Sequence, residues 1–218
     1  MINTLIPDNI ACEIVYENIS PSEVYSAERL IIMKASLNRK QEFLRGRNCA
    51  HQAIKKLNYA NQKPILIGKN REPVWPPGLI GSITHCNGYC AAVVAKLNDI
   101  TGVGIDAELN TNLKKTIISK TQTDSEIIRN SELLSENNIC INKLVFSAKE
   151  SVFKFIHPFI MKYINFKDIE ICVDLKTRTF STSFLKSDLY SRFKNSNLIG
   201  KFDFNNKHIV TCIFEIAQ

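Results

Sequence analysis

The sequence lacks the features that would assign it at once to several common classes of protein. None of its seven cysteines forms a C-x-x-C pair, there is no long block of basic residues, and no apolar run reaches the roughly eighteen residues of a membrane-spanning helix. His85, Cys86 and Cys90 have no second ligand pair at zinc-finger spacing. A zinc module, a membrane-spanning protein and a protein with a basic nucleic-acid-binding stripe are therefore not expected.

The charge and the cysteine usage of the 218-residue chain favour a cytoplasmic protein with an anionic partner. It has 28 Lys and Arg against 21 Asp and Glu, a net charge of +7, and the positive residues are scattered along the chain. The odd number of cysteines lies mostly in apolar segments, as expected for reduced thiols in a protein core. The first residues have no basic stretch before an apolar core, so no signal peptide is expected.

Hydrophobic periodicity and turn signals predict a mixture of helices and strands in one large domain or two small ones. Strands are predicted over residues 10–16, 79–84, 89–97, 100–107, 169–175, 179–185, 198–204 and 209–216. Helices are predicted from Ser20-Pro21 onward, over residues 38–57 and 124–135, and through Glu150 to about Pro158. Residues 68–78 and 110–123 are expected as loops, and any seam between two halves is expected just before Asp106.

Three acidic residues and one lysine indicate a divalent-metal site. Asp106 and Glu108 follow an apolar run, and alternate residues of an extended segment point to the same side. Two carboxylates about 5 Å apart repel by roughly 3 kcal/mol at an effective dielectric constant of about 20, so a metal or a cationic group must offset this repulsion. Glu150 and Lys154 are i,i+4 neighbours on the later helix. Three carboxylates and an ammonium suit magnesium bound to a phosphorylated substrate.

Each half of this pattern has a simpler explanation when it is taken alone. An Asp-x-Glu after a strand is often a solvated turn, and a Glu–Lys pair on a helix is usually a surface ion pair. Ser82 and Ser147 have no partners for a hydrolytic triad. The combination of the two halves therefore supports the metal site.

Four sequence blocks resemble the 4′-phosphopantetheinyl transferases of the larger, monomeric kind, especially the branch that serves enterobactin and similar siderophore synthases. The blocks are residues 43–50 (FLRGRNCA), 71–78 with 81–86 (REPVWPPG and GSITHC), 104–108 (GIDAE) and 146–154 (FSAKESVFK). They occur in the family's order. The last two blocks mark the superfamily, and W-P-x-G with T-H-C marks the siderophore branch.

The resemblance implies a reaction and a role for each matching residue. A serine of an apo acyl or peptidyl carrier protein attacks the pyrophosphate of coenzyme A, accepts 4′-phosphopantetheine and releases 3′,5′-ADP, with magnesium bound. The implied metal ligands are Asp106, Glu108 and Glu150, the implied catalytic residues are Glu150 and Lys154, and either Glu150 or a metal-bound water would take the serine proton. The residues implied in binding coenzyme A are His85 at the 3′-phosphate, helped by Arg47 and Thr84, Arg71 beside the adenosine, and Lys154 and Lys149 at the pyrophosphate.

The resemblance also implies the fold and the setting. An α+β fold is expected, with two pseudo-symmetric halves that each pack a helix on a small antiparallel sheet, and with the active site between residues 1–104 and 105–218. A monomer is expected, with a part in siderophore, nonribosomal peptide or polyketide synthesis. His51 stands where this branch more commonly has arginine, an exchange expected to weaken one phosphate contact or to make it pH-dependent.

Two other classes of function compete with this enzyme. A noncatalytic module that binds coenzyme A or a carrier protein would share the fold, but it would gain little from three mutually repelling carboxylates beside Lys154. A nucleic-acid binder is suggested by the net charge alone, and no recognition motif supports it.

Overall fold

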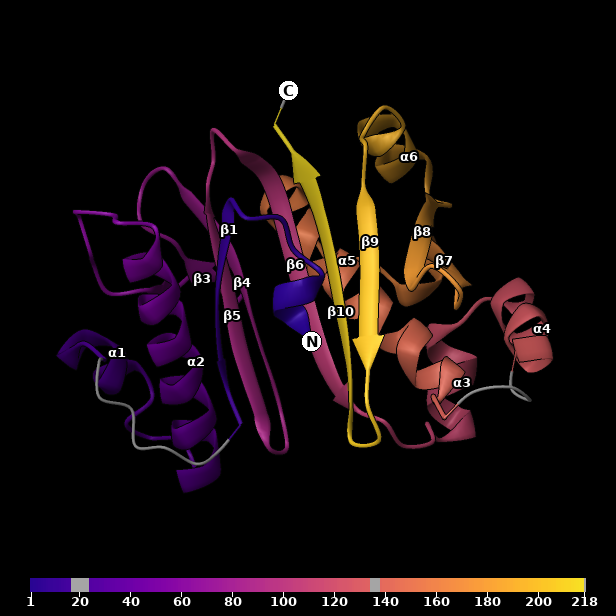
Figure 1. Cartoon of the computed structure of the whole chain (residues 1–218), viewed down its shortest axis with the longest axis horizontal. Coiled ribbons are helices and arrows are strands. Elements are labelled where there is room, and N and C mark those ends of the chain that lie inside the picture. The colour runs from indigo at the N-terminus through magenta and orange to yellow at the C-terminus, as the bar shows by residue number, and fades with distance from the viewer. Residues whose placement is uncertain (17–23, 134–137, 218) are drawn as a thin grey trace.

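The structure, a computed structural model, describes residues 1–16, 24–133 and 138–217, and in this part of the chain helices pack against antiparallel sheets (Figure 1). The predicted α+β class is confirmed. All seven cysteines are described and free; Cys12, Cys49, Cys90 and Cys212 are buried, as predicted for core thiols, whereas Cys172 is exposed.

The first half of the chain folds around a three-stranded antiparallel sheet. Its strands β1 (Ile10–Val15), β4 (Leu79–Cys86) and β5 (Tyr89–Lys96) lie in the order β1-β5-β4. The long helix α2 (Leu37–Lys56) packs on one face of this sheet because its apolar side chains recur at helical spacing. The short helix α1 (Ser26–Ile31) and the strands β2 (Leu66–Ile67) and β3 (Pro73–Val74) complete this half.

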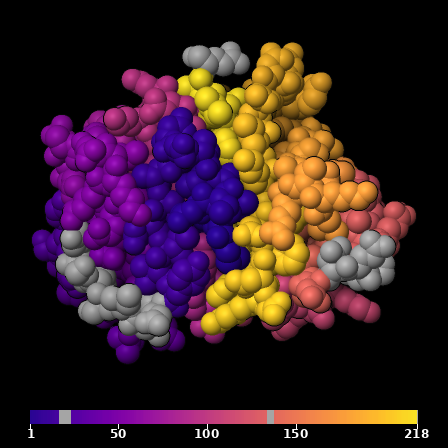
Figure 2. Space-filling model, viewed as in Figure 1, coloured from indigo at the N-terminus to yellow at the C-terminus, as the bar shows by residue number. Residues whose placement is uncertain are grey.

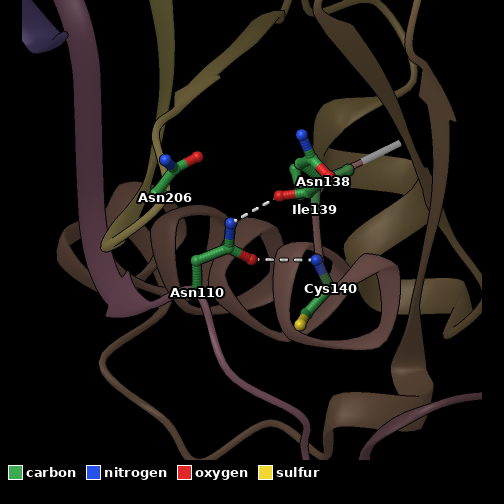
Figure 3. Close-up of a pocket in the computed structure, with 5 residues that line it drawn as sticks. All are labelled: Asn110, Asn138, Ile139, Cys140 and Asn206. Carbon is green, nitrogen blue, oxygen red and sulfur yellow. Dashed lines mark hydrogen bonds between the residues drawn. The ribbon is translucent and has the colours of Figure 1, made fainter.

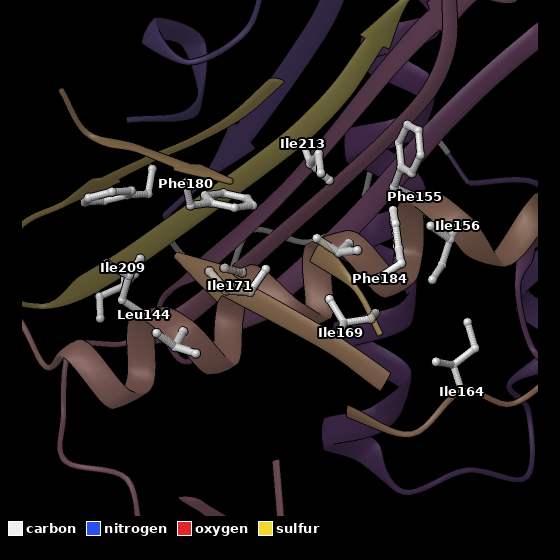
Figure 4. Close-up of a cluster of buried hydrophobic side chains, with 14 of the residues drawn as sticks. Leu144, Phe155, Ile156, Ile164, Ile169, Ile171, Phe180, Phe184, Ile209 and Ile213 are labelled. Carbon is white, nitrogen blue, oxygen red and sulfur yellow. The ribbon is translucent and has the colours of Figure 1, made fainter. Parts of the chain in front are cut away.

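The second half has a five-stranded antiparallel sheet in the order β6-β10-β9-β8-β7. Its strands are β6 (Ile100–Leu109), β7 (Ile169–Asp174), β8 (Thr179–Phe184), β9 (Ile199–Phe204) and β10 (His208–Ile216). Helix α5 (Ile141–Ile160) packs on this sheet, and Figure 4 shows part of the apolar cluster between them, including Leu144, Phe155 and Ile213. The remaining helices are α3 (Lys115–Thr121), α4 (Asp124–Leu133) and α6 (Ser187–Phe193), with 3₁₀ turns η1 (Ile2–Thr4) and η2 (Phe166–Asp168).

One order of elements occurs twice along the chain. The elements β1, α1, α2, β2, β3, β4 and β5 correspond in order to β6, α4, α5, β7, β8, β9 and β10, and α3 and α6 are additions to the second set. The pairing repeats as well, because β1-β5-β4 and β6-β10-β9 each place the last strand between the first strand and the strand before it.

A third apolar cluster joins the two halves on the face away from the long helices. Successive side chains of a strand alternate between faces, so β10 directs Val210 and Phe214 to this cluster and Ile209 and Ile213 to α5. The N-terminal segment is buried in the same cluster through Ile2. Figure 2 shows this segment, in indigo, directly beside the last strands, in yellow.

Side chains rather than a backbone ladder join β4 to β6. The two strands are described in full and belong to separate sheets. The hydroxyl of Ser82 accepts the N–H of Ile105 at 3.1 Å, and the hydroxyl of Thr84 accepts the N–H of Ala107 at 2.9 Å. The later residue of β4 is bonded to the later residue of β6, so the two strands run in the same direction. Asp106 lies between the two bonded residues of β6.

Two glycines let α5 lie directly on β6. A Cβ atom at Gly102 would overlap the ring of Phe155, and one at Gly104 would overlap the carbonyl oxygen of Ser151. Only a residue without a side chain fits at this distance. The close approach brings the next residues on the same side of β6 against α5, beginning with Asp106.

The predicted helices and strands are found, with a few differences. Residues 68–78 are not all loop, because Pro73–Val74 pair with β2 at an edge position, where a proline without an N–H is tolerated. Residues 110–123 include α3, whose Thr- and Ile-rich sequence has low intrinsic helix propensity. Helix α5 continues past Pro158 to Ile160, since one missing backbone bond is tolerated in a last turn that closes at Met161.

The predicted helix start at Ser20-Pro21 and the end of the 124–135 helix beyond Leu133 lie outside the described residues. The short helix α6 was not predicted, although Leu189 and Phe193 have the i,i+4 spacing of a buried face.

Candidate active site

Asp106 lies at the joint between the two halves and is bonded to side chains from both. Its Oδ1 accepts hydrogen bonds from Lys154 Nζ at 2.7 Å and from Thr84 Oγ1 at 3.2 Å, and its Oδ2 accepts one from Ser147 Oγ at 2.9 Å. Thr84 belongs to β4, while Ser147 and Lys154 belong to α5. The carboxylate is buried, and these three donors fix its orientation.

Glu108 lies two residues further along the same side of β6 and is paired with a different lysine. Its Oε2 is 3.1 Å from Lys143 Nζ, at the other end of the α5 face that carries Ser147 and Lys154. The ammonium of Lys143 also lies 5.9 Å from the ring centroid of Phe146. The side chains of Lys143 and Glu108 are 13% and 28% exposed, so the ion pair is partly buried.

Glu150 lies on α5 between these two ion pairs. The pKa of its carboxyl is raised because burial disfavours the charged form and because the charges of Asp106 and Glu108 repel it, although Lys154 opposes both effects. Its carboxylate has no hydrogen-bond or ion-pair partner among the residues that the structure describes. The charges of Asp106 and Glu108 thus both act on the carboxyl of Glu150.

The three carboxylates have the donor chemistry for magnesium, but they are not assembled around one point. In residues 1–16, 24–133 and 138–217, no three Asp, Glu, His or Cys side chains are close enough together to hold a metal ion. Lysines occupy two of the three carboxylates. Carboxylate oxygens that repel one another suit a hard dication such as magnesium. For Glu108 to bind the same ion as Asp106 and Glu150, its ion pair with Lys143 would have to break.

His85, at the end of β4, lies in a second charged group on the first half. Its Nε2 is 3.1 Å from Glu42 Oε2 and 3.5 Å from Arg39 Nη1, and Arg39 also contacts Glu42 at 3.4 Å. The pKa of His85 is lowered, mainly by burial and further by the charges of Arg39 and Lys154, while Glu42 acts in the opposite direction. Thr84, which donates to Asp106, directly precedes His85 on β4, so this group lies close to the acidic group.

The carboxylate of Glu42 thus occupies an anion-binding position between an imidazole and a guanidinium. Neither Glu42 nor Arg39 was selected from the sequence. Their spacing of three residues on α2 is an ordinary i,i+3 pair, so only the contact with β4 identifies them.

Two of the residues predicted to bind coenzyme A are occupied elsewhere. Arg47 is buried and donates through Nε to the carbonyl oxygen of Ile65 at 2.8 Å and through Nη2 to that of Leu66 at 3.4 Å. Burial lowers its pKa to about 10. Its guanidinium also covers the ring of Phe43 at 4.4 Å. Arg47 therefore holds the segment that leads into β2.

Lys149 faces away from the acidic group. It is fully buried and donates to Glu126 Oε2 at 2.6 Å and to the carbonyl oxygens of Thr121 at 2.8 Å and Phe166 at 3.0 Å. Successive residues of a helix are separated by about 100°, so Lys149 and Glu150 lie on different faces of α5. Lys149 therefore does not share the face of α5 that carries Glu150 and Lys154.

His51, predicted to weaken one phosphate contact or to make it pH-dependent, contacts Glu28 on α1. It is buried, and its Nε2 lies 2.8 Å from Glu28 Oε1. Arg71 is exposed and has a left-handed backbone with φ of 69°, in the turn between β2 and β3.

A shallow pocket lies beyond the end of β6, separate from these two charged groups. It has a volume of about 500 Å³ and is lined by Asn110, Asn138, Ile139, Cys140 and Asn206 (Figure 3). The side chain of Asn110 closes its base by donating to the carbonyl oxygen of Asn138 and accepting the N–H of Cys140. None of the predicted site residues lines it.

Comparison with known proteins identifies the family. The family description "4'-phosphopantetheinyl transferase N-terminal domain" matches residues 27–95, and "4'-phosphopantetheinyl transferase superfamily" matches residues 102–212. The 4'-phosphopantetheinyl transferase Npt of Nocardia iowensis is 29% identical over 178 residues, which cover 81% of this chain and 78% of Npt. The 4'-phosphopantetheinyl transferase Svp of Streptomyces mobaraensis is 32% identical over 189 residues, covering 85% and 76%.

A third relative bears on the predicted branch of the family. Enterobactin synthase component D of Salmonella austin is 34% identical over 129 residues, which cover 56% of this chain and 50% of that protein. None of the helices in the described residues carries an apolar stretch long enough to cross a bilayer. The matches to both family descriptions and to Svp show that the chain belongs to the 4′-phosphopantetheinyl transferase superfamily and is an enzyme of that class.

Proposed function

We propose that this chain transfers 4′-phosphopantetheine from coenzyme A to a serine of an apo acyl or peptidyl carrier protein. The serine oxygen forms a bond to the phosphorus that carries the pantetheine, the bond from that phosphorus to the bridging oxygen breaks, and 3′,5′-ADP leaves. The observation that supports this most is the position of Asp106, held by Thr84 of one half and by Ser147 and Lys154 of the other. Beside it lies the carboxylate of Glu150, for which the described part of the chain offers no hydrogen-bond or ion-pair partner.

We propose Asp106, Glu108 and Glu150 as the ligands of a magnesium ion. When bound, the ion supplies charge neutralisation to the pyrophosphate. Lys154, which Asp106 holds at the joint, adds a fixed positive charge beside the same group. Either the carboxylate of Glu150 or a water on the bound ion would accept the serine proton.

The 3′-phosphate is proposed to bind at His85 and Arg39 in place of the carboxylate of Glu42. A phosphate has the same sign and more oxygen acceptors than the carboxylate that it replaces. Arg71 remains a candidate for the adenosine side. Arg47 and Lys149 are left out of this proposal because their donors are used inside the fold.

The division of the chain is proposed to lie before Ile100 rather than between residues 104 and 105. The earlier position keeps β6 whole, and it separates the two repeated sets of elements.

The net charge of +7 suits an acidic carrier protein. A role in siderophore, nonribosomal peptide or polyketide synthesis, a cytoplasmic location and a monomeric state remain predictions.

The proposal is tested by intact-mass analysis of apo carrier proteins incubated with the purified protein, coenzyme A and magnesium. One added phosphopantetheine per carrier protein is expected. A folded protein that binds coenzyme A but modifies no carrier protein in a broad panel would favour the noncatalytic binding module instead.

A further inference from the structure

The ion pair between Lys143 and Glu108 suggests how the acidic group is kept closed before a metal binds. We infer that Lys143 is a positioning residue that holds Glu108 away from Asp106 and Glu150, and that a divalent cation must displace its ammonium to recruit the third carboxylate. The inference rests on the proposed function, in which Glu108 is a metal ligand.

The geometry assigns one lysine of α5 to each carboxylate of β6. Helix and strand run in opposite directions, because Lys143 contacts Glu108 whereas Lys154, later on the helix, contacts Asp106, earlier on the strand. The two lysines are eleven positions apart on the helix, which is about 16 Å along its axis. Neither lysine can therefore replace the other, and Glu150 lies between them.

The two lysines differ in how firmly they are held. Lys154 donates to Asp106 and, at 3.0 Å, to the carbonyl oxygen of Ile105, so the backbone of β6 anchors its ammonium. Within the described residues, Lys143 donates a hydrogen bond to Glu108 alone and otherwise faces the ring of Phe146. Lys143 can therefore move away from Glu108 without breaking a second hydrogen bond, whereas Lys154 cannot move away from Asp106 in this way.

The charges explain why the pair forms and why a cation breaks it. Three carboxylates and two ammonium groups give this region a net charge of −1, and each ammonium offsets the charge of the carboxylate that it contacts. Arrival of a dication reverses the sign to +1, so the second ammonium is then repelled. The same side chain thus stabilises the metal-free protein and competes with the metal for Glu108.

The competition is measured as metal affinity in the absence of substrate and carrier protein. Isothermal titration of the whole chain with magnesium, and with manganese as a second probe, is carried out on the wild type and on Lys143→Met, which keeps the apolar stem but removes the ammonium. A three- to tenfold tighter Kd is expected for Lys143→Met. Lys143→Arg, which keeps the charge, is expected to bind within twofold of the wild type.

Lys194→Met is the matched control, because it removes one positive charge from an exposed position after α6. It is expected to leave the Kd unchanged, which separates a local effect from the change in net charge. A second readout is the rise in Tm on adding magnesium, which should be larger for Lys143→Met than for the wild type. If Lys143→Met does not fold, Lys143→Gln serves for the same comparison.

The outcomes separate this inference from the proposed function. Metal binding and carrier modification by the wild type, together with an unchanged or weaker Kd for Lys143→Met, would overturn the role of Lys143 and leave the proposed function standing. A wild type that neither binds a divalent cation nor modifies a carrier protein would overturn both.

Discussion

Glu28 and Glu126 are bonded in the same way in the two halves of the chain. Glu28, on α1, accepts hydrogen bonds from the N–H groups of Tyr25 and Ile65 and pairs with His51 on α2. Its side chain is fully buried. The pKa of Glu28 is lowered, because these hydrogen bonds outweigh a burial that alone would raise it.

Glu126 repeats this pattern on α4. It accepts hydrogen bonds from the N–H groups of Thr123 and Ile171 and pairs with Lys149 on α5. Each glutamate therefore lies on a short helix and contacts both a long helix and the segment that follows the long helix. The basic partner differs, an imidazole in the first half and an ammonium in the second.

The correspondence extends to the lysine of the active site. Lys154 contacts Asp106 and the carbonyl oxygen of the residue before it, and Lys56 contacts Glu13 and the carbonyl oxygen of Cys12. The first half has Val15 two residues after its acidic residue and Gln52 four residues before its lysine, where the second half has Glu108 and Glu150. The three-carboxylate arrangement is therefore confined to the second half.

Removing Lys149 is expected to destabilise the protein strongly. Lys149→Met leaves the carboxylate of Glu126 buried without its cation, and breaking a buried pair in this way costs about 3–5 kcal/mol. Urea unfolding followed by circular dichroism measures this loss. Lys162→Met, at an exposed position just after α5, is the control and should change stability little.

A loss below about 1 kcal/mol for Lys149→Met would contradict the arrangement described for Glu126. The result also bears on catalysis. Activity per folded molecule should be retained, since Lys149 does not face the acidic group.

Glu150→Gln is expected to abolish carrier modification and to make the metal-free protein more stable. The raised pKa means that the folded state disfavours the ionised carboxyl, so neutral glutamine should increase the free energy of unfolding by on the order of 1 kcal/mol at pH 7.5. The wild type regains this stability as the pH falls through the folded-state pKa of Glu150. The difference between the two proteins should therefore shrink toward pH 4.

Urea unfolding at several pH values, without metal, measures this difference. Asp124→Asn, at an exposed acidic position in the first turn of α4, is the control for loss of one negative charge. A Glu150→Gln protein that is less stable than the wild type, or that modifies carrier protein at a normal rate, would contradict the assignment.

Coenzyme A should be preferred over its dephospho form more strongly at lower pH. The lowered pKa leaves His85 mostly neutral near pH 8, and a phosphate binds the imidazolium that forms as the pH falls through that pKa. The Kd of the dephospho form divided by the Kd of coenzyme A, measured by titration between pH 8 and 5.5, should rise several-fold as the pH falls. It should not rise in His85→Ala, in which the 3′-phosphate itself titrates and loses negative charge over the same range.

Glu42→Gln tests the proposed 3′-phosphate position by removing the competing carboxylate instead of the imidazole. Removing the carboxylate that pairs with His85 should tighten binding of coenzyme A about threefold and leave binding of the dephospho form unchanged. Equal effects on both ligands would remove this charged group from the 3′-phosphate site.

Gly104→Ala is expected to destabilise the protein and to reduce its activity. The new Cβ atom would overlap the carbonyl oxygen of Ser151 and lie 2.7 Å from the amide nitrogen of Phe155, so α5 must move outward. Overpacking of this kind costs about 1–3 kcal/mol. Thr101→Ala, at an exposed position on β6, is the control.

Both effects of Gly104→Ala should appear together, as a lower urea midpoint and as a lower kcat per folded molecule. An active variant of normal stability would mean that α5 and β6 are further apart than described.

The spacing of the acidic residues predicted which side chains share one side of a strand or one face of a helix, because that depends on local geometry alone. Alternation along a strand places Asp106 and Glu108 on one side, and the helical repeat places Glu150 and Lys154 on one face, whatever the rest of the fold does. The helical repeat also places Lys149 and Glu150 on different faces of α5. The resemblance to the family, which rests on residues 146–154 as one block, does not distinguish the two faces.

The remaining contacts depend on elements that are distant in sequence. Lys143 lies seven residues before Glu150, so helical spacing could have placed it on the same face, but its pairing with Glu108 requires the position of β6. The burial of His51 requires α1, which packs Glu28 against it. Local patterns contain no information on such pairings.

The joint between β4 and β6 has a consequence for ligand binding. Two hydroxyl groups, and no backbone ladder, connect these fully described strands, and the two charged groups lie on opposite sides of that connection. A molecule that contacts His85 and Asp106 together would link the two halves across this joint. Its binding free energy would then also stabilise the two halves against separation.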